Sequence, residues 1–265
     1  NSAGTLISAK GGASGNGAVV TLLNDSGNLV VNGGIDVSGP SATDGAIQLQ
    51  ANGSITGKGN LVGDTTGTLM VRTTGASGTQ NISLTGNQGS ATAATKASNT
   101  NNAMATAVFA TATSGSGSIT YYDKTGLTID TVSAQGALTS PAGVAANSVT
   151  GTSGITTVAG GANGAVVIGA GSTSGAGLTV TQAINTASGT ATVAGGSVLL
   201  EADGSIAITN NGGAQLGSIT TTGNGSGAGG EVYIHHTNVV AGDITLTGNS
   251  AGTLISAKGG ASGNG

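Results

Sequence analysis

The first seventeen residues of the chain, NSAGTLISAKGGASGNG, occur again without change as residues 249–265. The two copies begin 249 − 1 = 248 residues apart. Identity over such a stretch indicates a tandem array, in which each unit stacks on its neighbours instead of surrounding one central core. We therefore expect residues 1–265 to be one continuous segment, made of one 248-residue unit and the 17 residues, 249–265, that open the next identical unit.

Short aliphatic runs bounded by Gly, Asn or Asp follow one another along the chain. Examples are AVVTLL from Ala18, AIQLQ from Ala46 and TLMVRT from Thr68. Glycine, with 52 residues, interrupts every candidate helix and is unfavourable inside one. The pattern predicts an all-β protein in which each pass of the chain contributes three short strands separated by tight corners.

Successive passes define a series of expected coils. Their starts lie at Ala18, Ala46, Thr68, Met104, Ser118, Ser148, Ala165, Ser197 and Glu231, with the segment from Ala251 leading into the next unit. This gives about ten coils per unit, which advance about 48 Å at the roughly 4.8 Å spacing of strands. The pattern weakens over residues 87–117, where one irregular coil around Met104–Thr113 and a protruding loop both remain open.

Four segments share the form Ile-x-x-Ser/Thr-Gly, and we expect them to be equivalent third strands of their coils. They are residues 35–39 (IDVSG), 82–86 (ISLTG), 219–223 (ITTTG) and 244–248 (ITLTG). Because side chains alternate along a strand, the isoleucine and the central residue face inward and the hydroxyl residues outward. Stacking in register would place each aliphatic side chain on its equivalent, contributing about 1.5–3 kcal/mol for each buried residue.

The Gly-flanked segments GAVVTLL, GNLVVNGGIDVSG, GAIQLQANGSIT and GGSVLLEADGSIAI resemble the repeats of the filamentous haemagglutinin family, exoproteins of bacterial two-partner secretion. The resemblance covers the chain except residues 87–117 and 135–147. It implies a right-handed parallel β-helix, or β-solenoid, with triangular coils, exported across the outer membrane and displayed on the cell or shed. The secretion domain of that family is not recognisable in this sequence.

Composition excludes several classes of partner. Lys and Arg number six, occur singly, and leave a net charge of −4, so no basic surface for nucleic acid is expected. No apolar run reaches the roughly 20 residues that a membrane-spanning helix needs, so membrane insertion is not expected. Cysteine is absent, which excludes disulfides and thiolate metal sites.

Catalysis needs convergent ionisable groups, whereas the chain has two His, two Glu and eight Asp, thinly spread. His235 and His236 are adjacent on an expected strand and should point to opposite faces, so they cannot hold one ion together. Asp123–Lys124 has the form of a turn pair, and Arg72 is the single arginine. We expect no enzyme activity, no catalytic, cofactor-binding or metal residues, and no cofactor. Three further aspartates are expected at corners, bonding local amides, namely Asp25, Asp203 and Asp243.

Other short patterns have structural explanations. Gly225, Gly227 and Gly230 match a dinucleotide-binding fingerprint, but a strand-like EVYIHH follows in place of the helix that would receive a pyrophosphate. Lys58 lacks the glycine of a phosphate-binding loop, since Asn52 stands there. The three tyrosines could stack on sugar rings but are more typical of packing positions; they are Tyr121, Tyr122 and Tyr233.

Two functions remain after these exclusions. The preferred one is a non-enzymatic structural or adhesive filament on a bacterial surface or secreted from it, in which identical repeats stack end to end. Lateral contacts between fibres and a host-cell, surface or glycan target are open possibilities. The alternative is an ice- or polysaccharide-binding module whose outer wall carries paired hydroxyl residues, namely Ser83/Thr85, Thr220/Thr222 and Thr245/Thr247.

Overall fold

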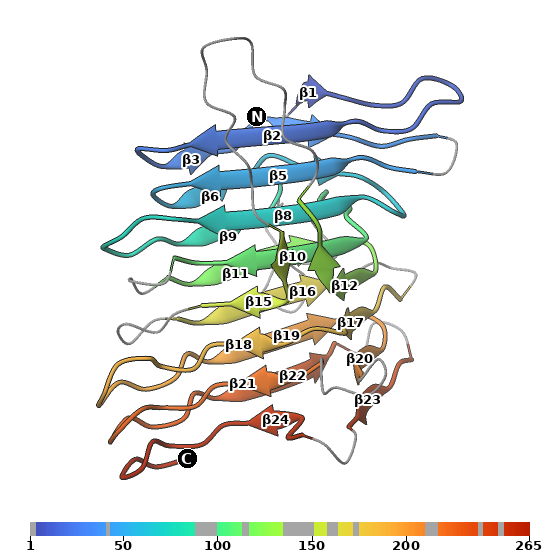
Figure 1. Ribbon diagram of the computed structural model, residues 1–265. Helices are drawn as coiled ribbons and strands as arrows, with labels where there is room; N and C mark the ends of the chain where they lie inside the picture. Colours follow the sequence, from blue (N-terminus) through green and yellow to red (C-terminus); the bar gives the residue numbers. More distant parts are fainter. Residues whose placement is uncertain are drawn as a thin grey trace.

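The computed structural model describes residues 4–40, 43–87, 100–112, 117–134, 151–157, 164–171, 175–209, 217–237, 241–248 and 252–265. Within these residues the chain is all-β, and no helix is present that could span a membrane. Strands from successive passes lie above one another, so the molecule is a stack that runs from the N-terminal to the C-terminal end (Figure 1).

The described strands form four sheets, in which all pairings but one are parallel. One sheet of seven strands runs the length of the stack. It contains β3 (Leu29–Val30), β6 (Ile55–Gly57), β9 (Ile82–Leu84), β11 (Ile119–Asp123), β16 (Val166–Ala170), β19 (Val198–Ala202) and β22 (Val232–His236). A three-stranded sheet at the N-terminal end contains β1 (Thr5–Ser8), β4 (Gly34–Asp36) and β7 (Leu61–Val62).

The largest described sheet has twelve strands and divides at β10 (Thr106–Ala110). Above β10 lie β2 (Val19–Asn24), β5 (Ala46–Ala51) and β8 (Thr68–Thr73). The first half of β10 pairs with β12, whereas its second half pairs with β15. One branch then contains β12 (Leu127–Ile129), β17 (Leu178–Val180), β20 (Ile206–Thr209) and β23 (Ile244–Thr247). The other branch contains β15 (Ile155–Thr156), β18 (Ile184–Asn185), β21 (Ile219–Thr220) and β24 (Ile255–Ser256).

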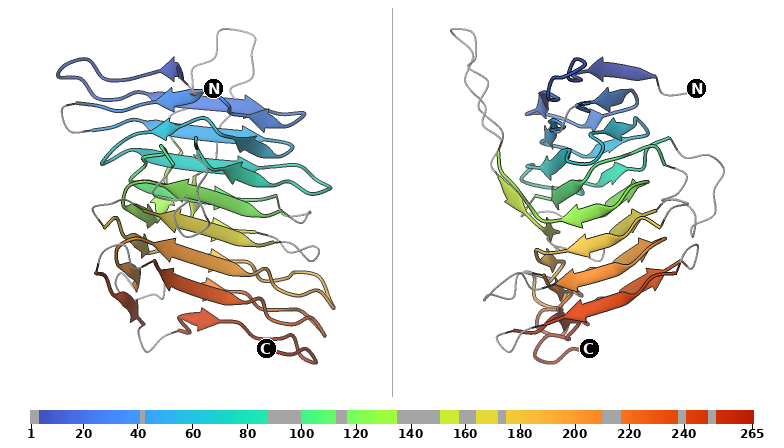
Figure 2. Two further views of the ribbon diagram at one scale, coloured as in Figure 1. Left: turned by 180° about the vertical axis from the view of Figure 1, so that it is seen from behind. Right: turned by 90° about the vertical axis from the view of Figure 1, so that its right-hand side faces the viewer.

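One antiparallel pair packs on the outer surface of the twelve-stranded sheet. It consists of β13 (Thr131–Val132) and β14 (Thr152–Ser153). Val132 is buried with Met70 and Val108, two residues on the outer side of β8 and β10. The side view separates these strands from the rest of the stack (Figure 2). The division of the sheet and its cover are features that the sequence pattern did not predict.

The core is a continuous column of stacked aliphatic side chains. In one branch Ile155 pairs with Ile184 and Ile184 with Ile219, and all three are buried. Three buried threonines follow these isoleucines two positions later and donate their hydroxyls to glycine carbonyls at the next corner, at 2.8, 2.5 and 2.7 Å. They are Thr157, Thr186 and Thr221. These three buried hydroxyls are therefore satisfied at the corner of their own pass.

The expected inward alternation is confirmed, but the expected equivalence of the Ile-x-x-Ser/Thr-Gly segments is wrong. Ile35 and Ile82 are buried with the residues two positions on, Val37 and Leu84. The four segments nevertheless lie in three different sheets, so they do not stack on one another. The motif marks a strand that ends at a corner, and such corners occur in three of the four described sheets.

The weakly patterned region contains one regular strand. β10 pairs along its whole length with β8, which supports the irregular coil around Met104–Thr113 for residues 104–112. Residues 88–99 and 113–116, and the second irregular region at 135–147, lie outside the described residues. The starts expected at Met104 and Ser118 lead into β10 and β11, which lie in different sheets and therefore belong to one pass of the chain.

Candidate functional site

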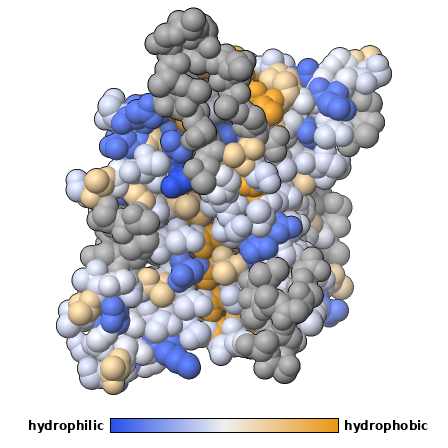
Figure 3. All heavy atoms as spheres, viewed as in Figure 1, coloured by the Kyte–Doolittle hydropathy of each residue, from blue (hydrophilic) through white to orange (hydrophobic). Residues whose placement is uncertain are grey.

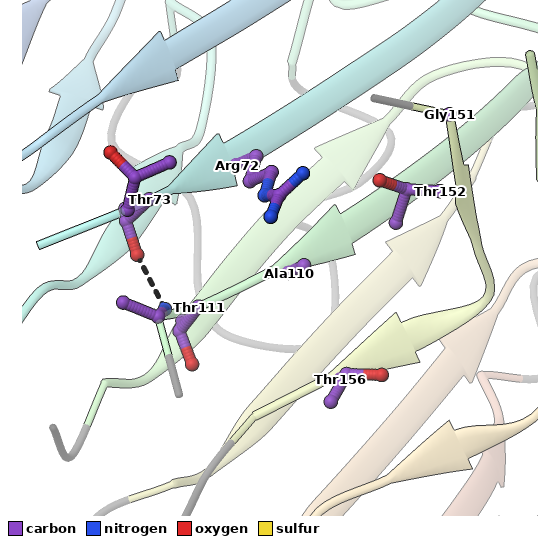
Figure 4. A pocket seen from close by; sticks show the side chains of 9 residues that line it. Arg72, Thr73, Ala110, Thr111, Gly151, Thr152 and Thr156 are labelled. Carbon is purple, nitrogen blue, oxygen red and sulfur yellow. Dashed lines mark hydrogen bonds between the residues drawn. The ribbon is translucent and has the colours of Figure 1, made fainter. Parts of the chain in front are cut away.

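A groove on the outer surface is the strongest candidate for a ligand site. It has a volume of about 390 Å³ and is lined by β8, β10, β14, β15 and the residues beside them. Arg72 on β8 pairs in the sheet with Ala110 on β10, which in turn pairs with Thr156 on β15. Because β14 lies over this face, Thr152 forms another wall of the groove (Figure 4).

The groove combines one cation with several hydroxyl groups. The Thr73 hydroxyl accepts a hydrogen bond from the Ala112 backbone N–H at 2.9 Å, which fixes one end. The Thr111 hydroxyl is buried and has no hydrogen-bond partner among the described residues. A buried polar atom without a partner is costly unless a water or a ligand satisfies it. Guanidinium and hydroxyl donors together suit a carboxylate-bearing or strongly hydroxylated ligand.

A row of threonines runs across successive strands of the twelve-stranded sheet. Register places Thr68, Thr106, Thr128, Thr179 and Thr245 on one line, with Ala207 interrupting it between the last two. The neighbouring residues of these strands, from Leu69 to Ile208, are buried, so the threonines face outward. Sequence reasoning missed this row because its members belong to different parts of the local pattern.

The hydroxyl pairs expected to form one wall do not share a row. Ser83 lies on β9 in the seven-stranded sheet, whereas Thr220 and Thr245 lie on separate branches of the twelve-stranded sheet. A flat wall built from these T-x-T pairs is therefore wrong. Local spacing defines which side of a strand a hydroxyl occupies, but it does not define the sheet to which the strand belongs.

The adjacent histidines point to opposite faces, as expected. Register pairs His235 with Glu201 and His236 with Ala202, a buried position. His235 Nδ1 lies 3.5 Å from Glu201 Oε1 on the neighbouring strand. The described residues contain no group of three His, Cys, Asp or Glu side chains arranged to hold a metal. The expectation that the chain has no catalytic, cofactor or metal residues remains a prediction.

Two of the three tyrosines are buried, but Tyr121 belongs to the core, whereas Tyr122 lies on the opposite side of β11 in one row with Gly169 and Glu201. The ring centroid of Tyr121 lies 5.1 Å from that of Phe109. Tyr233, which is 58% exposed, remains accessible on β22. The corner glycines Gly225–Gly230 are followed by this strand, as expected, and not by a helix.

Asp123 and Lys124 lie where β11 passes into a bend, as the turn pair predicted, but the carboxylate of Asp123 faces the interior. Asp123 is fully buried at the end of β11, where its carboxylate accepts four hydrogen bonds. The donors are the Tyr121 hydroxyl at 2.6 Å, the Met104 N–H at 2.8 Å, and the Thr125 N–H and hydroxyl at 2.8 and 2.6 Å. Asp123 thus ties Met104, before β10, to the end of β11 and the turn after it, and the D-x-T spacing is the signal by which it could have been found.

Burial raises the pKa of Asp123 from 3.8 to about 6, although its hydrogen bonds oppose the shift. A folded-state pKa above the unfolded value means that the folded protein gains stability from the protonated acid. We expect the free energy of unfolding to fall by on the order of 2–3 kcal/mol between about pH 4 and pH 6 because of this residue. Denaturant titrations of the wild type and D123N between pH 4 and 7 test this expectation.

The D123N variant should lose that part of the pH dependence even if its overall stability is lower. Asp36 and Asp44 serve as internal controls, because hydrogen bonds from Ser38 and from Gly39 and Thr66 outweigh desolvation and lower the pKa of each carboxyl. A lowered folded-state pKa makes their contribution to stability rise with pH, opposite in sign to that of Asp123. An unchanged slope in D123N would show that another group dominates the pH dependence.

No protein-family model, curated protein or solved structure matches this chain. The resemblance to filamentous haemagglutinin repeats therefore stays an expectation from the sequence.

Proposed function

We propose that this chain forms the shaft of a non-enzymatic extracellular filament, as a right-handed parallel β-helix with triangular coils and a tandem period of 248 residues. The observation that carries the proposal is the position of the duplicated sequence. One copy supplies β1 at the first level of the stack, and the other supplies β24 at the last level. An array of such units can continue in either direction without a capping element.

The interior supports a mechanical role. Its buried hydrophobic residues form one principal cluster that extends from Val20 to Ile219. Parallel ladders satisfy the backbone groups of each level through the levels above and below. Such a stack resists bending and offers a protease few exposed backbone segments, which are useful properties for a shaft on a bacterial surface.

The length of an array tests the proposal directly. Eight strands follow one another in one ladder of the described chain, namely β2, β5, β8, β10, β12, β17, β20 and β23. This number favours seven to eight coils per unit over the ten expected from the sequence. Each added unit should lengthen a rod by about 34–38 Å at roughly 4.8 Å per coil, compared with about 48 Å for ten coils. Electron microscopy of chains with two, four and six units measures this increment; compact particles, or rods that do not lengthen, would contradict the shaft.

Glycan binding at the Arg72 groove is a second candidate function, favoured by the unpartnered Thr111 hydroxyl among the described residues. We expect R72A to weaken binding of an acidic polysaccharide such as polygalacturonate by about tenfold or more, the usual effect of losing a charge-assisted contact. The control is K58A, which removes an exposed cation outside the groove. Titration calorimetry in low salt gives the comparison, and equal losses in both variants would indicate nonspecific attraction.

A further inference from the structure

The described parts of the two copies of the 17-residue sequence share one turn but contact the stack in opposite directions. In both, a glycine N–H donates to the carbonyl three residues earlier, from Gly15 to Gly12 at 2.9 Å and from Gly263 to Gly260 at 3.0 Å. The first copy pairs with β4, which follows it in the chain. The second copy pairs with β21, which precedes it. One local structure is therefore used at both ends.

The hydrogen bonds show that the copies use opposite edges. In the first copy the N–H groups of Ala9 and Gly11 donate toward the β4 side, at 2.8 and 3.0 Å. In the second copy three carbonyls accept from the β21 side at 2.8, 2.8 and 2.9 Å, those of Leu254, Ser256 and Lys258. These correspond to Leu6, Ser8 and Lys10, which alternate with Ala9 and Gly11. A bulge lies between Thr5 and Ile7, and before it the Gly4 carbonyl also accepts from Gly34 on the β4 side. After the bulge, because successive peptide groups point to opposite edges of a strand, each copy bonds through the edge that the other leaves open.

The space around one glycine of the repeat, Gly12 in the first copy and Gly260 in the second, also differs between the copies. A Cβ at Gly260 would lie 2.4 Å from backbone atoms of Gly225, whereas a Cβ at the equivalent Gly12 would have no atom within 4 Å. The first copy thus has open space on the side where the second copy meets a neighbouring level. That space is where the preceding level of the stack would lie.

Exposed apolar side chains also collect at the two ends. All six large hydrophobic residues exposed in the described part of the chain lie on end strands: Leu6, Val19 and Val30 at one end and Tyr233, Ile244 and Leu246 at the other. Apolar residues come to the surface at the N-terminal end of the stack (Figure 3). A hollow of about 80 Å³ lies there, lined by Leu6, Ile7, Leu22 and their neighbours. Exposed apolar clusters of this kind mark contact surfaces.

We propose that residues 249–265 of one chain bind β4 of a second, identical chain. There they take the place that residues 1–17 hold within a single chain. One 17-residue segment then lies between β21 of its own chain and β4 of the next. The partner is a second copy of this chain, and the proposal rests on the shaft function because it defines how successive units join.

Core residues continue across such a junction. Ile255 already pairs with Ile219, and by the register of the first copy it would also pair with Ile35 of the next chain. Ile244 and Leu246 extend the inward rows of Ile206 and Ile208 but end the ladder in this chain. The junction brings β3 below them, so that their exposed surfaces are buried against the next unit.

Simple stacking of the second copy on the first copy of another chain leaves a gap. The last pass of the chain consists of β22, β23 and β24 in that order. The next pass therefore begins directly below β22, with whichever strand follows β24. With the shared segment, β2 of the next chain fills that level. With simple stacking, β2 lies two levels below β22 and leaves unpaired backbone groups in between.

The corner geometry supports the alignment of β22 with β2. Gly230, just before β22, donates its N–H to the Thr221 carbonyl at 2.7 Å, and Ala18, just before β2, donates to the Ala9 carbonyl at 2.9 Å. In both corners the donor lies nine positions after the acceptor, at 230 and 221 and at 18 and 9. Since β22 belongs to the seven-stranded sheet and β2 to the twelve-stranded sheet, each junction rotates the sheets by one face around the stack.

Disulfide trapping in the full chain tests the exchange, because the wild type contains no cysteine. Register places Ser8 opposite Asp36 within one chain, so D36C/S8C should close an intramolecular disulfide and stay monomeric. In D36C/S256C the same pairing can form only between chains. We expect disulfide-linked multimers of this variant on non-reducing gels, in a proportion that rises with protein concentration during oxidation. S8C/S256C reports simple stacking, and the exchange predicts that it stays largely monomeric.

Proline variants at one position of the repeat should have opposite effects in the D36C/S256C background. A9P removes the N–H that holds the first copy on β4, so it should raise the multimer yield about 2- to 10-fold, the effect of one backbone hydrogen bond. A257P removes the equivalent N–H of the incoming copy and should lower the yield by a similar factor.

The outcomes separate the junction from the shaft. Multimers of S8C/S256C in place of D36C/S256C, or no multimers of D36C/S256C beyond the dimers of single-cysteine S256C, would overturn the exchange. Either result would leave the shaft proposal standing if covalent arrays still lengthen as rods. Arrays that fail to lengthen would overturn the shaft whatever the disulfide pattern.

Discussion

Replacing Ile184 with aspartate should lower the free energy of unfolding by about 4–5 kcal/mol, because it places an unpaired carboxylate in the aliphatic column. Ile184 has no exposed surface and lies between Ile155 and Ile219 on the neighbouring strands. Its backbone N–H donates to the Ser218 carbonyl at 2.7 Å, and its register partners on both sides are isoleucines, which offer the new charge no hydrogen bond. Denaturant unfolding followed by circular dichroism measures the loss.

The next residue provides a matched control. Asn185 is exposed on the outer side of the same strand, and its side-chain oxygen accepts the Ala187 N–H at 3.0 Å. N185D keeps this acceptor and adds the same charge, so its effect should stay within about 0.5 kcal/mol. Comparable losses in the two variants would mean that Ile184 does not face a core.

Hydrogen exchange should show that the Ile184→Asp lesion is local. Since each level contacts only those above and below it, protection should be lost first in β15, β18 and β21. β5 and β8, at the N-terminal end of the stack, should keep theirs longer (Figure 1). Simultaneous loss everywhere would indicate a single cooperative domain instead of a stack of coupled levels.

The sequence predicted the strands and their inward faces because alternation is a local property. Ile47 and Leu49, for example, have no exposed surface on β5, as AIQLQ indicates. Alternation has a period of two residues and distinguishes only the two sides of a strand. It could not assign Ile82 and Ile219 to different sheets, nor predict that β10 would pair with two strands on one side. Those features depend on corner lengths and on packing between levels.

The candidate groove was beyond sequence reasoning for the same physical reason. Arg72 and Thr152 are 80 residues apart, 152 − 72, and meet only because β14 folds back over the outer surface of the sheet. No local pattern relates the two. Asp123 differs, because two of its partners, Tyr121 and Thr125, lie two residues away on either side and were visible as Y-Y-D-K-T.

Replacing Gly45 with alanine should cost about 2–4 kcal/mol, because successive corners approach too closely for a side chain. A Cβ at Gly45 would lie 1.8 Å from the Ala18 carbonyl oxygen, a contact that only backbone movement can relieve. Movement is opposed by the Gly45 N–H, which donates to the Val37 carbonyl at 2.8 Å, and by the Gly45 carbonyl, which accepts from Thr68 at 3.2 Å.

The loss in G45A should follow from crowding and not from glycine content as such. Gly189 is the control, because a Cβ there meets no atom within 4 Å, and G189A should be neutral or slightly stabilising through the unfolded chain. Thermal and denaturant unfolding of both variants gives the comparison. Equal stability of G45A and G189A would mean that β2 and β5 lie further apart than their pairing allows. The close stacking on which a continuous shaft depends would then be wrong.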